Sequence, residues 1–302
     1  MNILITGAYS WTEEQMNILK SLDFMVDYQQ FEHDKVSHPE IYDIVVCNNL
    51  FKYNNPELFR NLRMIQLVSA GIDESLSDYA SKTNIALFNA RGVYSIPIAE
   101  TVIMQILNIY KNSKKFLKNQ ELHVWEKDRN LLELTDKTAL IIGYGSIGKE
   151  IAKRLKAFGV HITTANRIIE MDENTDDAFA LPFINRYAQD YDIIIVSIAS
   201  CEDTYGLVGK DFFDNMKQDS VFINISRGNV IDEDALIDQI KKGKFRGVAL
   251  DVMKTEPLDE NNCLWDLDGL YITPHNSFIS DKIHTRMFKV ILDGLLTFKE
   301  GQ

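Results

Sequence analysis

The stretch from residue 139 to residue 155 constrains the fold more than any other part of the chain. It passes from an apolar strand pattern through a glycine turn into a helical pattern, and the turn holds a complete G-x-G-x-x-G motif. In such a motif the first glycine permits a tight turn, the second lets a pyrophosphate approach bare backbone, and the third lets the helix pack on the strand. Free N–H groups at the helix start then attract the anion. We therefore expect a dinucleotide to contact Gly143, Tyr144, Gly145, Ser146, Ile147 and Gly148.

The length and composition of the chain indicate a globular protein of two unequal domains. Its 302 residues exceed a typical single domain, and 45% of them are apolar and 25% charged. No apolar run approaches the roughly twenty residues that span a bilayer. The N-terminal residues have the pattern of a first strand rather than of a signal peptide.

Charge and cysteine usage narrow the choice of partners and compartment. The formal net charge of −12 disfavours nucleic acid and anionic membranes as partners, so a small anionic substrate would need a local positive site. The three cysteines, Cys47, Cys201 and Cys263, lie far apart and form no C-x-x-C pair. This pattern predicts reduced thiols in the cytoplasm, without a disulfide, structural zinc or other metal site.

Two successive blocks of alternating strand and helix patterns predict an α/β fold with two open parallel sheets. In the first block we expect strands at residues 3–6, 25–28, 44–47, 64–68 and 86–88, with a helix at 13–22. In the second block we expect strands at 138–142, 160–164, 192–197, 220–225, 246–250 and 270–273, and a weaker one at 181–183. Runs of Ile and Val such as residues 193–196 are typical of strands covered on both faces. One helical segment begins near Pro97 and continues into a basic run at 111–118, and another occupies 281–298.

Four polar residues follow strands of the second block and are candidates for catalysis: Arg227, Asp251, Glu256 and His275. Because ligands of open parallel sheets bind beyond the carboxyl ends of the strands, these side chains can face one crevice. Arg227 can grip a carboxylate and polarise an adjacent ketone. His275 can protonate the ketone oxygen as a hydride arrives, and Glu256 can fix the tautomer of His275. The set therefore matches the needs of 2-oxo acid reduction.

The chain resembles the D-isomer-specific 2-hydroxyacid dehydrogenase family over nearly its whole length. The glycine turn, Ser226-Arg227-Gly228, the stretch from Asp251 to Glu256-Pro257, and Pro274-His275 match the motifs of the family in order and spacing. The resemblance implies that Arg227, Glu256 and His275 are catalytic. It further implies that Asp251, Ile225 and Ser226 contact the nicotinamide end of the cofactor.

The resemblance also implies how the chain is divided. A flavodoxin-like substrate domain would comprise residues 1–98 and 280–302, and a Rossmann NAD(P)-binding domain residues 99–279, with a closing hinge between them. Residues 68–73 resemble the loop that holds the substrate carboxylate through the backbone N–H groups of Ala70 and Gly71. Asn89 and residues 97–101 match the segment that enters the first interdomain helix. A homodimer through the dinucleotide domain is usual in the family.

The chain departs from the family pattern in two places. After the second strand, NAD-specific members carry an acidic residue for the ribose hydroxyls, whereas this chain has Asn166 followed by Arg167. The missing carboxylate and the neighbouring guanidinium favour a 2′-phosphate, so we expect NADP(H) over NAD(H). In the loop at residues 197–204 only Thr204 aligns with the family, and we expect it to contact the cofactor.

Structural roles are alternatives for each of these residues. Arg227 could pair with Asp232 on the surface, Glu256 could be a turn residue before Pro257, His275 could be a core histidine, Asp251 could cap a turn, and Arg167 could be an ordinary exposed charge. The other five histidines, of which His284 is the closest rival to His275, are expected to be structural or exposed. The basic run at 111–118 is expected to be a solvated helix face, and Phe116 and Trp125 are expected to pack within the subunit or at a dimer contact.

The favoured function is hydride transfer between NAD(P)H and a small 2-oxo acid, such as glyoxylate or hydroxypyruvate, or the corresponding D-2-hydroxy acid. Two alternatives stay open. One is an activity of the phosphoglycerate dehydrogenase type, and the other is a non-catalytic, NAD(H)-sensing interaction protein built on the same fold.

Overall fold

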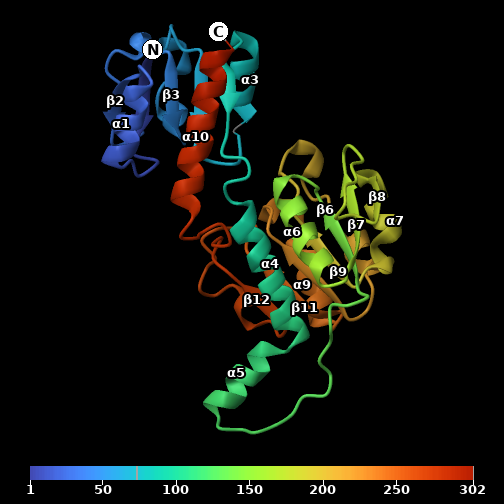
Figure 1. The fold of residues 1–302 in the computed structure, drawn as a ribbon. Helices are drawn as coiled ribbons and strands as arrows, with labels where there is room; N and C mark the ends of the chain where they lie inside the picture. The colour runs from blue at the N-terminus through green and yellow to red at the C-terminus, as the bar shows by residue number, and fades with distance from the viewer. Residues whose placement is uncertain (73, 302) are drawn as a thin grey trace. The chain divides into compact units, whose positions relative to one another are not determined.

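The computed structural model describes residues 1–72 and 74–301, which form two compact units (Figure 1). The first unit comprises Met1–Tyr94 together with the chain from Ser280 to the C-terminus, and the second comprises Ser95–Ile279. Each unit contains one parallel sheet, of five and seven strands respectively. This architecture confirms the α/β fold with two parallel-sheet domains that the sequence predicts.

The first unit has the strand order β2-β1-β3-β4-β5, which is the flavodoxin-like order. Its strands are β1 (Asn2–Thr6), β2 (Met25–Gln29), β3 (Ile44–Cys47), β4 (Met64–Leu67) and β5 (Ala86–Phe88). Its helices are α1 (Glu13–Ser21), α2 (Leu50–Tyr53), α3 (Glu74–Thr83) and α10 (Ile283–Glu300), with short 3-10 turns at Pro39–Ile41 and Pro56–Leu58.

Successive residues of its strands enter two different cores, because side chains alternate between the faces of a sheet. On one face, Ile3 and Ile44 pack with side chains of α1 and α10 that include Leu19 and Ile291. On the other face, the core contains Leu4, Val45 and Ile65 together with Leu50, Leu76 and Ala80 of α2 and α3. Segments from both ends of the sequence therefore build this unit.

The second unit has the strand order β12-β11-β10-β9-β6-β7-β8. Its strands are β6 (Thr138–Ile142), β7 (His161–Asn166), β8 (Asp177–Ala180), β9 (Ile193–Val196), β10 (Ser220–Asn224), β11 (Phe245–Leu250) and β12 (Leu270–Ile272). Its helices are α4 (Ser95–Tyr110), α5 (Ser113–Glu121), α6 (Ser146–Ala157), α7 (Ile184–Tyr187), α8 (Lys210–Asn215) and α9 (Glu233–Lys241). The 3-10 turns are at Leu181–Phe183, Ala188–Asp190, Glu202–Thr204, Gly228–Val230 and Cys263–Asp266.

The order of the first six strands of this sheet is that of a Rossmann domain, with β12 added at the edge. The order reverses between β6 and β9, and a dinucleotide crosses the sheet at such a point. One face is covered by α7, α8 and α9, whose side chains join Leu140, Ile194 and Phe222 in a core. On the other face α4 packs against α6 and β11 (Figure 1).

Two local expectations were wrong. The strand expected at residues 181–183 lies earlier, at Asp177–Ala180, where it pairs with the end of β7. Leu181–Phe183 is a 3-10 turn instead, because Pro182 has no N–H to give a strand ladder.

The expected helix does not run from Pro97 through the basic residues. Asn112 adopts a left-handed conformation with φ 50°, which ends α4 and starts the separate helix α5.

None of the helices in residues 1–72 and 74–301 has both the length and the apolar character needed to cross a bilayer.

Candidate active site

The three glycines of the turn between β6 and α6 have different roles. Gly143 has φ +99°, and a Cβ atom there would lie 2.6 Å from the backbone nitrogen of Ile198. A Cβ atom on Gly148 would lie 2.3 Å from the carbonyl oxygen of Gly143, so this glycine lets α6 pack on the turn. Around Gly145, by contrast, no heavy atom lies within 4 Å of an added Cβ. The second glycine therefore leaves open space where a ligand can reach the backbone.

This open space lies at the N-terminus of α6, a helix of 12 residues. Its N-cap residue is Gly145, so no side chain caps the first N–H groups. These groups and the helix dipole favour an anion at this position. The cradle, which a single Cβ would fill, thus fits the pyrophosphate of a dinucleotide. Ser146 and Ile147 are partly exposed beside it.

Tyr144 can present only its backbone to a ligand in the glycine turn. Its side chain is buried, and its hydroxyl donates a hydrogen bond of 2.7 Å to the carboxylate of Asp172. Burial, reinforced by that carboxylate, raises the pKa of Tyr144, so the phenol stays protonated as the donor. This bond ties the segment after β7 to the glycine turn.

The end of β7 carries the two residues expected to select the cofactor. Asn166 is the last residue of the strand and is partly exposed, and Arg167 follows it on the surface. One Nη atom of Arg167 lies 3.5 Å from a carboxylate oxygen of Asp203 and also contacts the sulfur of Cys201. Arg167 is therefore an ion-pair partner of the loop that follows β9.

Thr204 shapes that loop through its buried side chain. Its hydroxyl accepts the backbone N–H of Cys201 at 2.8 Å and donates to the carbonyl of Ala199 at 2.8 Å. The hydroxyl of Thr204, which we expect to contact the cofactor, is therefore already hydrogen-bonded within the turn at residues 199–204.

The other candidate residues follow three neighbouring strands. Asn224 at the end of β10 is in register with Leu250 of β11, and Leu250 is in register with Ile272 of β12. Adjacent strands lie about 4.8 Å apart. The segments that begin at Ile225, Asp251 and Thr273 therefore leave the same edge of the sheet side by side.

Arg227 lies at the tip of the β10 segment with its side chain exposed. One Nη atom donates to the carbonyl of Ser226 at 2.6 Å. The carboxylate of Asp232 instead accepts the N–H of Ala235 and caps α9, and the described chain contains no ion pair between Arg227 and Asp232. The guanidinium consequently keeps donors available for an anion.

The turn after Arg227 packs directly on the segment that carries Glu256. A Cβ atom on Gly228 would lie 2.0 Å from the carbonyl carbon of Met253. The N–H of Met253 in turn donates to one carboxylate oxygen of Glu256 at 3.0 Å. Only glycine allows this approach, which brings the two motifs together.

Glu256 and His275 form a hydrogen-bonded pair. The other carboxylate oxygen of Glu256 lies 2.8 Å from Nδ1 of His275, and the two side chains are 34% and 37% exposed. Since the carboxylate binds the proton on Nδ1, it fixes the tautomer and orientation of the ring and leaves Nε2 available. Within the described residues Nε2 has no hydrogen-bond partner. Glu256 is thus more than a turn residue before Pro257.

The backbone of His275 is in a left-handed conformation, with φ 50°. Its N–H donates to the carbonyls of Asp251 at 2.8 Å and Thr273 at 2.9 Å. A non-glycine residue in this region is strained by about 1–3 kcal/mol and persists only where its surroundings hold it. His275 is accordingly an anchored, partly exposed histidine rather than a core residue.

Asp251 is the main anchor of the His275 segment and is only 3% exposed. Its carboxylate accepts the hydroxyl of Thr273 at 2.6 Å, the N–H of Asn276 at 2.9 Å, and both the N–H and hydroxyl of Ser277. Sequence reasoning missed Thr273, Asn276 and Ser277. The polar residues on both sides of His275 were the available signal.

Ile225 and Ser226 support the same edge of the sheet. The N–H of Ile225 donates to the carbonyl of Val196 at 3.1 Å. The buried hydroxyl of Ser226 donates to the side chain of Asn224 at 2.7 Å. The backbone of Ile225 and the side chain of Ser226 therefore hold the segment that leads to Arg227.

The loop expected to bind the substrate carboxylate belongs to the first unit and follows β4. Asn89 donates a side-chain N–H to the carbonyl of Ala70 at 2.7 Å, and the hydroxyl of Ser69 donates to the carbonyl of Gly71 at 2.8 Å. Both Ala70 and Gly71 are exposed. The acceptors in both bonds are backbone carbonyl oxygens, and the bonds fix the orientation of the loop. Asp73, the last residue of the matching stretch, lies outside the described residues.

His284, the rival of His275, has a structural role in the first unit. Its ring stacks on Tyr9 with centroids 4.6 Å apart, and the hydroxyl of Tyr9 donates to its carbonyl at 3.0 Å. This contact holds the start of α10 against the segment after β1.

Fold and site together define a dinucleotide-dependent dehydrogenase. The model of the D-isomer specific 2-hydroxyacid dehydrogenase, NAD binding domain, matches residues 103–277, which is more than half of the chain. The chain belongs to the D-isomer-specific 2-hydroxyacid dehydrogenase family. It is an NAD(P)-dependent oxidoreductase that acts on the CH–OH group of its donor.

Similar proteins include the human glyoxylate reductase/hydroxypyruvate reductase, which is 32% identical over 249 residues that cover 80% of this chain and 75% of that protein. The D-3-phosphoglycerate dehydrogenase of Archaeoglobus fulgidus is 29% identical over 243 residues. This match covers 80% of the chain but only 46% of that relative. Among solved structures, a D-isomer specific 2-hydroxyacid dehydrogenase from Xanthobacter autotrophicus in complex with NADPH has a TM-score of 0.84. It is 20% identical, with 100% of this chain and 95% of that chain covered.

Proposed function

We propose that this dehydrogenase acts on a small 2-oxo acid of the glyoxylate or hydroxypyruvate type, or on the corresponding D-2-hydroxy acid. The pairing of Glu256 with Nδ1 of His275, beside Arg227 at the tip of a neighbouring strand, carries this proposal. The similarity to human glyoxylate reductase/hydroxypyruvate reductase supports the substrate class.

The proposed roles follow from the chemistry of the side chains. A bound nicotinamide dinucleotide supplies the hydride for the carbonyl carbon. His275 donates the proton on Nε2 to the ketone oxygen and, in the reverse direction, removes the hydroxyl proton. Glu256 holds Nδ1 and stabilises the charged imidazolium. Arg227 binds the carboxylate and polarises the ketone through its N–H donors.

We assign the first unit as the substrate domain and the second as the cofactor domain. The units divide at Tyr94/Ser95 and Ile279/Ser280, a few residues before the first boundary that the sequence suggested and at the second. In this assignment the backbone N–H groups of Ala70 and Gly71 bind the substrate carboxylate. The glycine turn and the segments at Asn166, Thr204, Ile225, Ser226 and Asp251 contact the cofactor.

For the cofactor we propose a preference for NADP(H). The end of β7 presents Asn166 and Arg167 and no carboxylate of its own, which suits a 2′-phosphate. The test is the ratio of dissociation constants for NADPH and NADH, in wild type and in Arg167→Ala. A strong preference of the wild type for NADH would overturn this choice.

The substrate is tested by steady-state assays with glyoxylate, hydroxypyruvate, pyruvate and 3-phosphoglycerate. We expect the highest kcat/KM with one of the first two. Activity with 3-phosphoglycerate far above that with glyoxylate would favour the second candidate, which the similarity to the Archaeoglobus enzyme supports. Cofactor-dependent capture of a partner protein without turnover of any of these acids would favour a sensing role.

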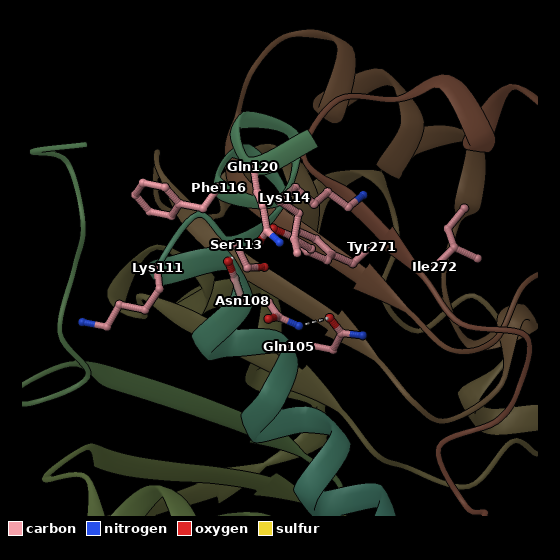
Figure 2. A pocket seen from close by; sticks show the side chains of 10 residues that line it. Gln105, Asn108, Lys111, Ser113, Lys114, Phe116, Gln120, Tyr271 and Ile272 are labelled. Atoms are coloured by element: carbon pink, nitrogen blue, oxygen red, sulfur yellow. Dashed lines mark hydrogen bonds between the residues drawn. The ribbon is translucent and has the colours of Figure 1, made fainter. Parts of the chain in front are cut away.

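We further propose a homodimer through the second unit. Helix α5 and the segment that follows it extend away from the sheet of this unit (Figure 1). Trp125 is 98% exposed, and Leu117 and Leu122 are exposed as well, so these apolar side chains are not covered by their own subunit. Beside it lies a cavity of about 670 Å³ lined by α4, α5 and β12 (Figure 2).

A second copy of the chain suits both features, since a two-fold interface presents the same protruding segment and the same cavity on each subunit. Lys114 and Tyr271 both line this cavity (Figure 2). The ammonium of Lys114 lies 4.3 Å from the centroid of the Tyr271 ring. We expect Trp125→Ala to shift the mass measured by light scattering from dimer to monomer. Trp265→Ala, which changes an exposed tryptophan outside the segment, should leave the dimer intact.

We place the enzyme in the cytoplasm, with a small organic acid as its partner and neither nucleic acid nor membrane. The unpaired state of Cys47, Cys201 and Cys263 and the net charge of −12 support this placement.

A further inference from the structure

We propose that Asp203 is a specificity-determining residue that competes with the 2′-phosphate of NADP(H) for Arg167. The inference rests on the proposed function, because it concerns the dinucleotide site of the second unit. Asp203 would limit the preference for NADP(H) that Asn166 and Arg167 create, so that the ion pair rather than Arg167 alone sets the balance between the two cofactors.

The topology places the two residues on either side of the cofactor turn. Strand β6, which ends in that turn, pairs with β7 on one side and with β9 on the other. Arg167 follows β7, and Asp203 lies in the 3-10 turn Glu202–Thr204 after β9. Their side chains meet at 3.5 Å, so the ion pair joins the two loops that flank the start of α6.

This is the region where the adenosine end of a dinucleotide is held. In a Rossmann domain the residue at the end of the second strand contacts the ribose 2′ position, and here that strand is β7. A 2′-phosphate at this position would lie within reach of Arg167. It would also lie close to the carboxylate that Arg167 already binds.

The turn that carries Asp203 is fixed by its own hydrogen bonds. The buried hydroxyl of Thr204 accepts the N–H of Cys201 and donates to the carbonyl of Ala199. The N–H of Gly206 donates to the carbonyl of Asn229 at 2.9 Å, which ties the end of the turn to the next loop. The backbone of Asp203 is thus held in place, while its side chain and that of Arg167 are 82% and 55% exposed.

The charge of the 2′-phosphate makes the ion pair affect the binding of NADP(H) more than that of NAD(H). A phosphate monoester carries a charge of about −1.5 to −2 at neutral pH, and a guanidinium binds it through paired N–H donors. To bind NADP(H), Arg167 must exchange the carboxylate of Asp203 for the phosphate, and the two anions then repel each other. NAD(H) has hydroxyl groups at this position and meets neither cost. Exposed ion pairs contribute only about 0.2–1 kcal/mol, so the expected effect is several-fold.

The test compares Asp203→Asn with the matched control Glu202→Gln, a neighbouring exposed carboxylate for which the described chain shows no ion pair. Dissociation constants are measured by calorimetry at low ionic strength for NADPH, NADH and 2′,5′-ADP, a probe that has the phosphate without the nicotinamide. We expect Asp203→Asn to tighten NADPH and 2′,5′-ADP by about fivefold, with NADH changed less than about twofold. Glu202→Gln should change all three by less than about twofold.

A double-mutant cycle tests whether Asp203 acts through Arg167. In an Arg167→Ala background, Asp203→Asn should lose most of its selective effect, because there is no longer a guanidinium to release. Equal changes in Asp203→Asn and Glu202→Gln would overturn the inference, and so would equal tightening of NADH and NADPH. Failure of the wild type to bind any dinucleotide would instead overturn the proposed function, and the inference with it.

Discussion

The carboxylate of Asp251 accepts both the backbone N–H and the hydroxyl of Ser277, two residues after His275. The carbonyl of Asp251 accepts the N–H of His275 itself. One buried residue at the end of β11 therefore fixes the segment that carries the proposed acid at the end of β12.

Replacement of Asp251 by Asn should destabilise this segment, because a charged acceptor with several donors becomes a neutral one. We expect the free energy of unfolding to fall by about 2 kcal/mol, which is the usual contribution of hydrogen bonds to a charged group. Ser277→Ala removes a single side-chain bond and should cost about 1 kcal/mol. Urea titrations of both variants measure the difference, and an unchanged midpoint for Asp251→Asn would contradict the anchoring role.

Glu256→Gln keeps a hydrogen-bond acceptor near Nδ1 of His275 but removes the charge that stabilises the imidazolium. Reduction of the 2-oxo acid needs a proton from Nε2, and without the carboxylate the ring loses the charged partner that orients it. In Glu256→Gln kcat should therefore decrease by about ten- to a hundredfold, while the dissociation constant of the cofactor stays unchanged. Both quantities are measured in this variant and in His33→Ala, an exposed-histidine control. An unchanged kcat would show that Glu256 does not act through His275.

Gly145→Ala and Gly148→Ala should affect two different properties, cofactor binding in the first variant and stability in the second. A methyl group on Gly145 meets open space in the protein but fills the proposed pyrophosphate cradle, so the dissociation constant of the cofactor should rise at least about tenfold with stability unchanged. A methyl group on Gly148 meets the carbonyl of Gly143 at 2.3 Å, so this variant should lose about 1–3 kcal/mol of stability. Calorimetry and thermal melts separate the two effects. Normal cofactor binding by Gly145→Ala would place the dinucleotide elsewhere.

Asp192 links the starts of β6 and β9 and should contribute a pH-dependent part of stability. It accepts the N–H of Thr138 at 3.1 Å and the ammonium of Lys217 at 2.6 Å. Burial acts to raise the pKa of Asp192, but the bonds from Lys217 and Thr138 outweigh it and hold the pKa below its ordinary value. A depressed pKa in the folded state stabilises the protein above the unfolded pKa of about 3.9, and this contribution is lost as the pH falls through the folded pKa.

Asp192→Asn should therefore lower the free energy of unfolding by about 1.5 kcal/mol at neutral pH. The difference from wild type should shrink below about pH 4. Denaturant unfolding at several pH values tests this, with the exposed Asp190→Asn as control. A difference that stays constant from pH 7 to pH 3 would contradict the role of the carboxylate charge.

Features with strong local patterns could be predicted from the sequence. The glycine turn, the Ile- and Val-rich strands and the motifs at Arg227, Glu256 and His275 all depend on residue types at fixed spacing. The structure brings Glu256 and His275 together at 2.8 Å, although they are separated by 19 positions in sequence. The direction of parallel strands made that meeting predictable.

Features that depend on contacts between loops could not be predicted in the same way. The ion pair between Arg167 and Asp203 joins residues whose spacing carries no signal, and the bond between Tyr144 and Asp172 joins a cofactor motif to a loop without one. The break between α4 and α5 depends on one left-handed residue, Asn112, within an otherwise continuous helical pattern. Residues 181–183 form a 3-10 turn and not a strand, because Pro182 within this apolar run has no N–H to give a strand ladder.

The most direct test of the catalytic assignment is stopped-flow absorbance at the reduced nicotinamide band, with glyoxylate or hydroxypyruvate mixed into protein that holds the cofactor. We expect the wild type to oxidise the reduced cofactor rapidly. In His275→Ala the rate should be lower by about a hundredfold or more, with the dissociation constant of the cofactor unchanged. A near-wild-type rate in His275→Ala, or no oxidation by a wild-type protein that binds the cofactor, would contradict the assignment.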